Sequence, residues 1–242
     1  MRILIIGCTH FGKTLAGYDW KREFDRALGD VISRSLQADL LVHLGDLFDC
    51  GHPTPRDYAH ALDALDSIGC PMFIMKGNHD ENPGLEPDAL EPLTRFRFRQ
   101  EVKFIREPGV NGIGGKVFAF LPFWNDAKAR AFRGKSAQEE ADDLIQNVTR
   151  METYNSANER LPVSMLFTHV DVEGLGHPVE ETSQRTNVAV KLEDLKKLPF
   201  NVAVGHYHSS MHFEPNVYVP GSLLPFDFSE VGNEKFCLTV DL

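Results

Sequence analysis

Short, uninterrupted apolar runs alternate with amphipathic segments over the first third of the chain. The apolar runs have the length of strands that are buried on both faces, and they cover residues 2–7, 39–44 and 71–75. Between them, apolar residues recur with helical spacing at 20–36 and 55–67. Thr54 and Pro55 are residue types favoured at the N-cap and at the first position of a helix. This β-α-β-α-β order predicts a largely parallel sheet whose carboxyl-end loops share one edge.

The rest of the chain continues the alternation less regularly. Strands are predicted at 102–106, 116–120, 163–168 and 200–204, and in a tail expected to be antiparallel at 211–213, 217–219 and 235–240. Helices are predicted from the capping box of Ser136 and Glu139 to about Ser156, and at 192–198. Residues 95–99 alternate Arg with Phe. A strand there would place three cations on one face, and it would be either an exposed edge strand or a contact to a phosphate backbone. We therefore expect one α/β domain that spans residues 1–242 and contains two sheets.

Charge and cysteine usage narrow the function classes. The formal net charge of −10 argues against tight binding of nucleic acid by the whole surface. The negative charge does not exclude a phosphate-containing substrate, because bound divalent cations would supply positive charge at the place where the substrate binds. The cysteines Cys8, Cys50, Cys70 and Cys237 form no CxxC pair, which is typical of a reduced cytoplasm rather than of a disulfide framework. No apolar run approaches the length of a membrane span, so we expect a cytoplasmic protein without a membrane partner.

Side chains that can bind metals follow several of the predicted strands. They are His10, Asp46, Asn78, His169, His206 and His208. His206 and His208 are two residues apart, so both point to one face of an extended segment. Asp46 can bridge two cations with its two oxygens, and Asn78 offers a neutral oxygen. This mixture of nitrogen and oxygen ligands favours Mn²⁺, Fe or Zn²⁺ over Ca²⁺, and two such ions would polarise a phosphoryl oxygen and stabilise the leaving oxygen.

Residues beside these motifs have candidate roles of their own. His79 could contact a phosphate oxygen or protonate the leaving group. Asp49 and Asp80 are interpreted as outer partners that fix the tautomer of a ligand histidine. His177 and Arg185 are interpreted most simply as residues of a solvated loop, with contact to the substrate as the alternative.

Taken in order, these motifs resemble the calcineurin-like metallophosphoesterase superfamily. The matching motifs are position 8 with His10, Gly45 to Asp49, Gly77 to Asp80, His169, and Gly205 to His208. Two further stretches are similar to the SbcD/Mre11 nuclease branch, namely Asp49 with Pro53 to Ala59, and Pro220 to Phe226. The resemblance covers the chain from residue 2 to about residue 230.

The resemblance implies a four-layer αββα sandwich of the metallophosphoesterase type and phosphodiester hydrolysis with two divalent metals, Mn²⁺ before Zn²⁺ or Fe. It implies a first metal held by position 8, His10, Asp46 and His208, and a second held by Asp46, Asn78, His169 and His206. His79 would be the catalytic histidine. A homodimer through helices near 55–67 and 86–99 is also suggested.

The chain departs from the family's pattern at two points. Cys8 stands where the family has aspartate. Four interpretations of Cys8 are open. It could be a thiolate ligand that favours Zn²⁺ or Fe, or a weak ligand of a metal site that is only partly filled. It could also mark a non-catalytic scaffold, or be an introduced substitution. We expect a partly exposed thiol that limits the first metal site. The chain also stops at Leu242, without the C-terminal capping domain and ATPase-binding segment of SbcD-like and Mre11-like chains, so an ATPase partner stays an open question.

The function inferred from the sequence is that of a metal-dependent phosphodiesterase, a DNA exonuclease or endonuclease of SbcD/Mre11 type. An alternative is a small-molecule phosphatase or cyclic-nucleotide phosphodiesterase, which the acidic charge and the missing cap favour. The other alternative is a non-catalytic interaction module with a metal site weakened at Cys8. The presence of both His79 and His208 argues against this alternative.

Overall fold

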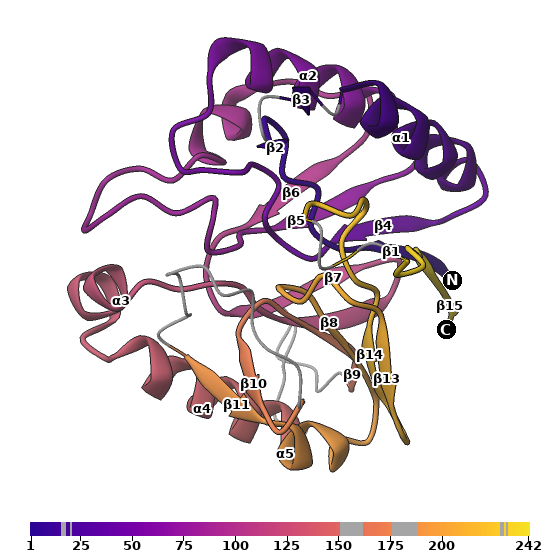
Figure 1. The fold of residues 1–242 in the computed structure, drawn as a ribbon. Coiled ribbons are helices and arrows are strands. Elements are labelled where there is room, and N and C mark those ends of the chain that lie inside the picture. Colours follow the sequence, from indigo (N-terminus) through magenta and orange to yellow (C-terminus); the bar gives the residue numbers. More distant parts are fainter. Residues whose placement is uncertain (16–17, 20, 151–161, 176–187, 228–229, 231) are drawn as a thin grey trace.

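The computed structural model describes residues 1–15, 18–19, 21–150, 162–175, 188–227, 230 and 232–242. His177 and Arg185, and the end of the helix expected to reach Ser156, lie outside these residues. Two sheets pack face to face in the centre of the molecule, and helices cover both outer faces (Figure 1). The chain therefore folds as the expected four-layer αββα sandwich.

The first sheet contains the N-terminal strands. Its spatial order is β15 (Leu238–Asp241), β1 (Arg2–Ile6), β4 (Leu40–His43), β5 (Met72–Met75) and β6 (Val102–Ile105). The strands β1, β4, β5 and β6 run parallel, and β15 pairs with β1 in the antiparallel direction. The predicted β-α-β-α-β start is confirmed.

The second sheet is built from the later part of the chain. Its spatial order is β13 (Met211–Phe213), β14 (Val217–Val219), β12 (Asn201–Val204), β9 (Val163–Thr168), β8 (Lys116–Leu121) and β7 (Gly109–Ile113). Only the outer pairs β13–β14 and β7–β8 are antiparallel. The tail strands β13 and β14 pair in the expected antiparallel direction, and β14 also pairs in parallel with β12. Two short pairs stand apart: β2 (Thr14–Leu15) with β3 (Tyr18–Asp19), and β10 (Asp171–Glu173) with β11 (Ala189–Lys191).

Helices cover the outer faces of the two sheets. The described ones are α1 (Lys21–Ser35), α2 (Pro55–Asp66), the 3-10 helix η1 (Glu91–Arg95), α3 (Asp126–Arg133), α4 (Ala137–Thr149) and α5 (Leu192–Lys196). The predicted N-cap Thr54 begins α2 and the predicted capping box of Ser136 begins α4; Thr54 also forms a capping box, with Asp57. The apolar stripe of α2, with Ala61, Ala64 and Leu65, packs into the core, so it does not by itself mark a dimer surface.

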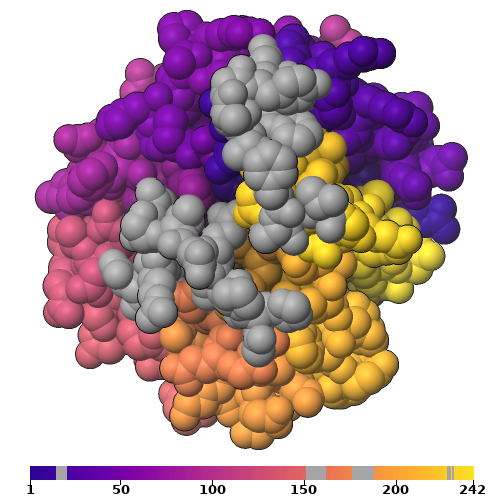
Figure 2. Space-filling view, in the orientation of Figure 1, coloured from indigo at the N-terminus to yellow at the C-terminus, as the bar shows by residue number. Residues whose placement is uncertain are grey.

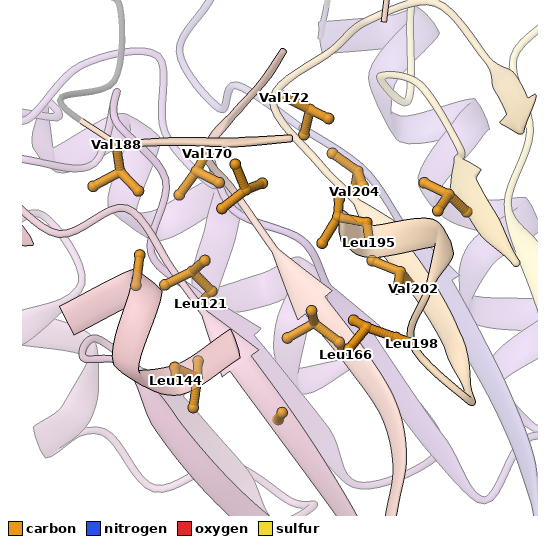
Figure 3. Packing of buried hydrophobic residues seen from close by; sticks show 14 of the residues in the cluster. Leu121, Leu144, Leu166, Val170, Val172, Val188, Leu195, Leu198, Val202 and Val204 are labelled. Atoms are coloured by element: carbon orange, nitrogen blue, oxygen red, sulfur yellow. The ribbon is translucent and has the colours of Figure 1, made fainter. Parts of the chain in front are cut away.

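Side-chain alternation along the strands explains the continuous apolar runs. In β1, Ile3 and Ile5 face the other sheet, whereas Leu4 and Ile6 pack under α1 and α2. The second sheet does the same, and Figure 3 shows Leu121, Leu166 and Val204 of its strands packing toward Leu144 and Leu195 of the helices. Both faces of the central strands are therefore buried, and a strand with two buried faces needs apolar residues at every position. Figure 2 shows the early and late parts of the chain forming one continuous surface around these layers.

Three local predictions need correction. Residues 95–99 form no strand, because Pro92 favours a helical turn that ends at Arg95, and Arg99 pairs with Asp66 at 3.0 Å. The sequence analysis missed β7, a half-exposed edge strand with two glycines, because it lacks a continuous apolar run. The helix α3 was not predicted either, since half of its eight residues are charged and three of the others are alanine. In the described parts of the chain, no helix combines the length and apolar character needed to cross a membrane.

The layer between the two sheets is predicted to dominate stability. Phe167 is fully buried there, with its ring 5.3 Å from that of Phe120 and 5.8 Å from that of Phe118. Phe167→Ala is expected to lower the free energy of unfolding by about 3–5 kcal/mol, because it leaves a cavity between two rigid sheets. Phe132→Ala, at a side chain that is 65% exposed on α3, should change it by less than about 0.5 kcal/mol. Urea unfolding followed by circular dichroism measures both, and equal losses would contradict the prediction.

Candidate metal centre

The candidate ligands lie on loops at the carboxyl ends of five strands from both sheets. Cys8 and His10 follow β1, Asp46 follows β4, Asn78 and His79 follow β5, His169 follows β9, and His206 and His208 follow β12. Because the strands within each sheet that carry these loops are parallel, the loops share one edge, and the packing of the two sheets brings the two edges together. Residues separated by up to 200 positions thereby meet in one buried cluster.

One group of these side chains surrounds Cys8. The ligand atoms of Cys8, His10 and His208 lie within 4.8 Å of one another. The Nε2 atoms of His10 and His208 are 3.1 Å apart. Asp46 Oδ2 lies 3.8 Å from Cys8 Sγ and 3.8 Å from His10 Nε2. This group contains the four residues that the sequence assigns to a first metal.

A second group surrounds Asn78. Its Oδ1 atom is 3.0 Å from His169 Nε2 and 3.0 Å from His206 Nδ1. Asp46 Oδ2 is 3.2 Å from the same His169 nitrogen. Asp46 therefore belongs to both groups, which is the position that a bridging carboxylate needs.

The separations fit a metal centre. With metal–nitrogen and metal–oxygen distances of about 2.0–2.2 Å, neighbouring ligand atoms lie roughly 3.0–3.5 Å apart, and a sulfur ligand lengthens that edge. The measured edges of 3.0–3.8 Å have this size. The donor set of imidazoles, one carboxylate, one amide and one thiol suits transition metals rather than Ca²⁺.

Backbone conformation also distinguishes the ligands. Within the described residues, the non-glycine positions with positive φ are His10 (48°), Asp46 (54°) and His206 (72°), all three candidate ligands. Such conformations cost of order 1–3 kcal/mol each and persist where the surrounding structure imposes them, often at functional sites. They turn each side chain back toward the shared edge.

Each ligand histidine has a partner on its outer nitrogen. His169 Nδ1 donates to the carbonyl oxygen of Leu44 at 2.6 Å, which leaves Nε2 unprotonated toward the cluster. The outer nitrogens of the other three lie near carboxylates: His10 Nδ1 at 3.4 Å from Asp49, His206 Nε2 at 3.2 Å from Asp171, and His208 Nδ1 at 2.9 Å from Glu230. Such partners orient the ring and raise its basicity as a ligand.

Sequence reasoning named Asp49 among these partners and missed Asp171 and Glu230. Asp171 could have been found, because it lies two residues after His169 in a segment that continues into β10. Glu230 carries no spacing signal: it is separated from His208 by 22 positions and reaches it only through the tertiary fold.

Asp80 has a different role from the expected one. The sequence analysis interprets it as a partner of a histidine, but its carboxylate accepts the backbone N–H groups of Leu47 (3.2 Å), Phe48 (2.9 Å) and Gly77 (2.9 Å). The reason is its position: Asp80 is fully buried beneath the two loops that carry Asp46 and Asn78. It therefore joins these loops to each other.

A buried ion network supports the same loop from the other side. Lys76 is fully buried, and its Nζ lies 2.6 Å from Glu81 Oε2. Lys128 of α3 also binds the Glu81 carboxylate, so the loop is held between β5 and a helix of the other half. Burial lowers the pKa of Lys76 in spite of the raising effect of Glu81. Lys76 Nζ also lies 3.9 Å from Asp88 Oδ2, so Lys76 and Glu81 each have more than one partner of opposite sign.

His79 lies at the margin of the cluster. Its backbone N–H donates to Asp46 Oδ1 at 2.8 Å, and its Nδ1 donates to the Asp49 carbonyl oxygen at 2.9 Å. Its ring stands edge-on to His10 with centroids 4.7 Å apart. Because the carbonyl oxygen can only accept, Nδ1 carries the hydrogen in the neutral ring, and Nε2 is left to exchange a proton.

Burial controls the charges of the centre. It lowers the pKa of His10 to about 4, so this ring is neutral and able to bind a metal at neutral pH. Although burial opposes it, the Asp46 carboxylate raises the pKa of His169. His169 and the neighbouring histidines in turn hold the pKa of Asp46 well below its usual range. Burial and Asp46 raise the pKa of Asp80.

The expectation of a partly exposed Cys8 is wrong. Its side chain has no exposed surface, because the loops after β1 and β12 close over it. Burial and the nearby Asp46 raise the pKa of the thiol to about 11. Without a cation beside it, Cys8 is a protonated, inaccessible thiol, and ready oxidation from solvent is no longer expected.

The loops approach each other closely at glycines. A side chain at Gly77 would collide with the backbone and carboxylate of Asp46, and one at Gly7 would collide with the carbonyl of Gly221. These positions need glycine for proximity, since neither has a positive φ.

Comparisons with known proteins agree with this geometry. The sequence model of the calcineurin-like phosphoesterase family matches residues 1–225. The SbcD component of the nuclease SbcCD from Staphylococcus epidermidis is 24% identical over 253 residues, covering 100% of this chain and 66% of that protein. The DNA double-strand break repair protein Mre11 of Methanosarcina acetivorans is 31% identical over 135 residues, covering 52% of this chain and 22% of that protein. The chain thus spans about two thirds or less of the length of the curated relatives it matches.

A solved structure, that of the protein of unknown function AQ665 from Aquifex aeolicus, is 12% identical and covers 78% of this chain and 88% of its own. Its TM-score of 0.35 is too low to support an argument. The family match is different in kind, because it extends over nearly the whole chain and includes every motif that converges on the cluster. The chain belongs to the calcineurin-like phosphoesterase family.

Proposed function

We propose that this protein is a metal-dependent phosphodiesterase that cleaves DNA, an exonuclease or endonuclease of the SbcD/Mre11 type. Membership of the family supports hydrolysis of phosphate esters. The observation that carries the proposal further is the pair of ligand groups that share Asp46. The relatives, a nuclease component and a DNA double-strand break repair protein, support DNA as the substrate.

The proposed metal ligands follow the two groups. Cys8, His10, Asp46 and His208 would hold one divalent cation, and Asp46, Asn78, His169 and His206 would hold the other. Mn²⁺ is the proposed metal, with Zn²⁺ or Fe as alternatives. Two bound cations would supply a nucleophile from water at neutral pH and stabilise negative charge on the phosphoryl group.

The chain's own residues supply orientation and proton transfer. The outer carboxylates, Asp49, Asp171 and Glu230, hold three imidazole rings with one nitrogen toward the centre. His79 delivers a proton from Nε2 to the leaving oxygen when both of its ring nitrogens carry hydrogen, while the Asp49 carbonyl holds Nδ1–H and keeps the ring in place. The buried walls of the cluster limit competing water, which strengthens these electrostatic interactions.

A small-molecule phosphatase or cyclic-nucleotide phosphodiesterase remains the second candidate. The net charge of −10 favours it, because an acidic surface repels a long polyanion. A non-catalytic module is disfavoured because His79 lies at the cluster with its tautomer fixed.

A panel of four substrates tests the proposal: single-stranded DNA, duplex DNA, a bis-aryl phosphate diester and an aryl phosphate monoester. With added Mn²⁺, DNA and the diester are expected to be cleaved faster than the monoester. Asp46→Asn keeps the shape but removes the shared negative charge, so calorimetry should show loss of Mn²⁺ binding together with loss of cleavage. Preference for the monoester would favour the phosphatase, and no cleavage with any metal would favour the non-catalytic module.

His79→Ala is expected to lower turnover of the diester by about 10²-fold or more while Mn²⁺ binding, measured by calorimetry, is retained. The reason is that His79 would transfer a proton without holding the metal. His52→Ala removes an exposed histidine of the loop before α2 and serves as the control. An equal loss of metal affinity in His79→Ala would instead make His79 a ligand.

Cys8→Asp is expected to raise Mn²⁺-dependent diesterase activity, because a carboxylate is a harder ligand than a thiolate and has a second oxygen. Cys8→Ala should weaken binding of one Mn²⁺ equivalent without unfolding the protein. Cys50→Asp adds the same charge at an exposed cysteine and controls for charge alone. Turnover is measured across an Mn²⁺ titration, and if Cys8→Asp is no more active at any concentration, Cys8 does not limit the site.

A further inference from the structure

His43 is a buried polar residue at the end of β4 that belongs to neither ligand group. The rest of that strand, Leu40, Leu41 and Val42, is apolar. A buried imidazole is stable only where its two nitrogens find hydrogen-bond partners. The partners of the His43 ring therefore indicate what this residue does.

Both ring nitrogens of His43 are engaged by the loops that carry the candidate ligands. The backbone N–H of Gly45 donates to Nδ1 at 3.2 Å. Nε2 lies 2.9 Å from the hydroxyl oxygen of Thr9, and that hydroxyl donates to the carbonyl oxygen of Leu47 at 3.1 Å. Because both nitrogens are occupied in this way, His43 is not a further metal ligand.

These three hydrogen bonds can run in only one direction. A backbone N–H can only donate, so Nδ1 of His43 is unprotonated and the neutral ring carries its hydrogen on Nε2. Nε2–H donates to the Thr9 oxygen, and the Thr9 O–H is left for the Leu47 carbonyl, which can only accept. Burial lowers the pKa of His43 to about 3, so the ring is neutral at neutral pH.

The same hydrogen bonds join the loop after β1 to the loop after β4. Thr9 lies between the candidate ligands Cys8 and His10, and the other two bonded groups are backbone groups on either side of Asp46. The backbone N–H groups of Thr9 and His10 also donate to the Asp46 carbonyl oxygen, at 3.1 and 3.0 Å. His10 and Asp46 both have positive φ, a conformation that persists only where the surroundings impose it. The hydrogen bonds of His43 are part of those surroundings.

We propose that His43 is a positioning residue of the metal centre, which fixes the spacing between the loop of Cys8 and His10 and the loop of Asp46. The inference rests on the proposed function, in which Asp46 is shared by both ligand groups. A shift of either loop would change the separations of 3.8 Å from Asp46 Oδ2 to Cys8 Sγ and to His10 Nε2. His43 thus acts through the ligands and touches neither metal nor substrate.

Thr9→Val tests the inference, because it keeps the shape of the side chain and removes the hydroxyl that links the two loops. Binding of Mn²⁺ alone, measured by calorimetry, should weaken roughly tenfold or more, the usual effect of losing a residue that orients a metal ligand. Thr9→Ser keeps the hydroxyl and should restore most of the affinity. His43→Leu removes both bonds of the ring and should weaken Mn²⁺ binding at least as much as Thr9→Val. If His43→Leu does not fold, Thr9→Val decides.

Ser35→Ala is the matched control. Ser35 has a buried hydroxyl on α1, which accepts the backbone N–H of Gly69 at 2.9 Å and donates to the Ile32 carbonyl oxygen at 2.7 Å. Its loss therefore removes two hydrogen bonds of a similar kind outside the metal centre. Ser35→Ala should lower the free energy of unfolding, as Thr9→Val does, and leave the Mn²⁺ affinity unchanged.

Labelling of buried thiols detects the same effect without metal or substrate. Cys8 is adjacent to Thr9, Cys70 is adjacent to the glycine that Ser35 binds, and both cysteines are buried. Metal-free protein is treated with N-ethylmaleimide, and peptide mass spectrometry follows each cysteine. Thr9→Val and His43→Leu should accelerate labelling of Cys8 more than labelling of Cys70, whereas Ser35→Ala should do the reverse.

The two measurements separate this inference from the proposed function. If the wild type binds Mn²⁺ but cleaves no diester, the catalytic proposal fails, and the positioning role stands on the weaker Mn²⁺ binding and selective Cys8 labelling of Thr9→Val. If Thr9→Val matches Ser35→Ala in both measurements, the positioning role is wrong, whatever the diesterase activity. Selective labelling of Cys8 with unchanged Mn²⁺ affinity would also overturn it, because the loops would then move without effect on the metal centre.

Discussion

The carboxylate of Asp46 is the point on which the arrangement of the centre depends. Oδ2 lies 3.2 Å from His169 and 3.8 Å from both His10 and Cys8, and Oδ1 accepts the backbone N–H of His79. A buried carboxylate is stable only where positive charge or donors surround it. The backbone N–H of His79 meets part of that need, and cations would meet the rest. The demand of one buried charge thus links loops from both sheets.

Several structural features hold those loops at the required distance. Glycine at position 77 lets the loop after β5 touch Asp46, and Asp80 joins the same two loops through backbone N–H groups. Lys76 and Glu81 form a buried ion pair beneath them. None of these residues belongs to either ligand group, yet each restricts where Asn78 can lie. Supporting shells of this kind decide how well a metal site is preorganised.

The sequence by itself determined the type of fold and which residues form the cluster of candidate metal ligands. Apolar runs such as 2–7 and 71–75 are long enough only for strands buried on both faces, and polar motifs directly after strands must lie at a sheet edge. Both signals are local, with periods and spacings that survive in one dimension. For the same reason, the edge strand β7 and the polar helix α3 were missed: neither buries enough surface to leave a strong apolar pattern.

Only the tertiary structure decided what surrounds each site residue. Asp80 and Cys8 show this most clearly. The sequence predicts that both lie near the candidate metal ligands, but not that Asp80 binds backbone N–H groups or that Cys8 is fully buried. Glu230 reaches His208, and Asp171 reaches His206, through contacts between segments that are separated in the chain. Burial and partnership depend on which surfaces pack together, and that is a property of the three-dimensional arrangement, not of residue spacing.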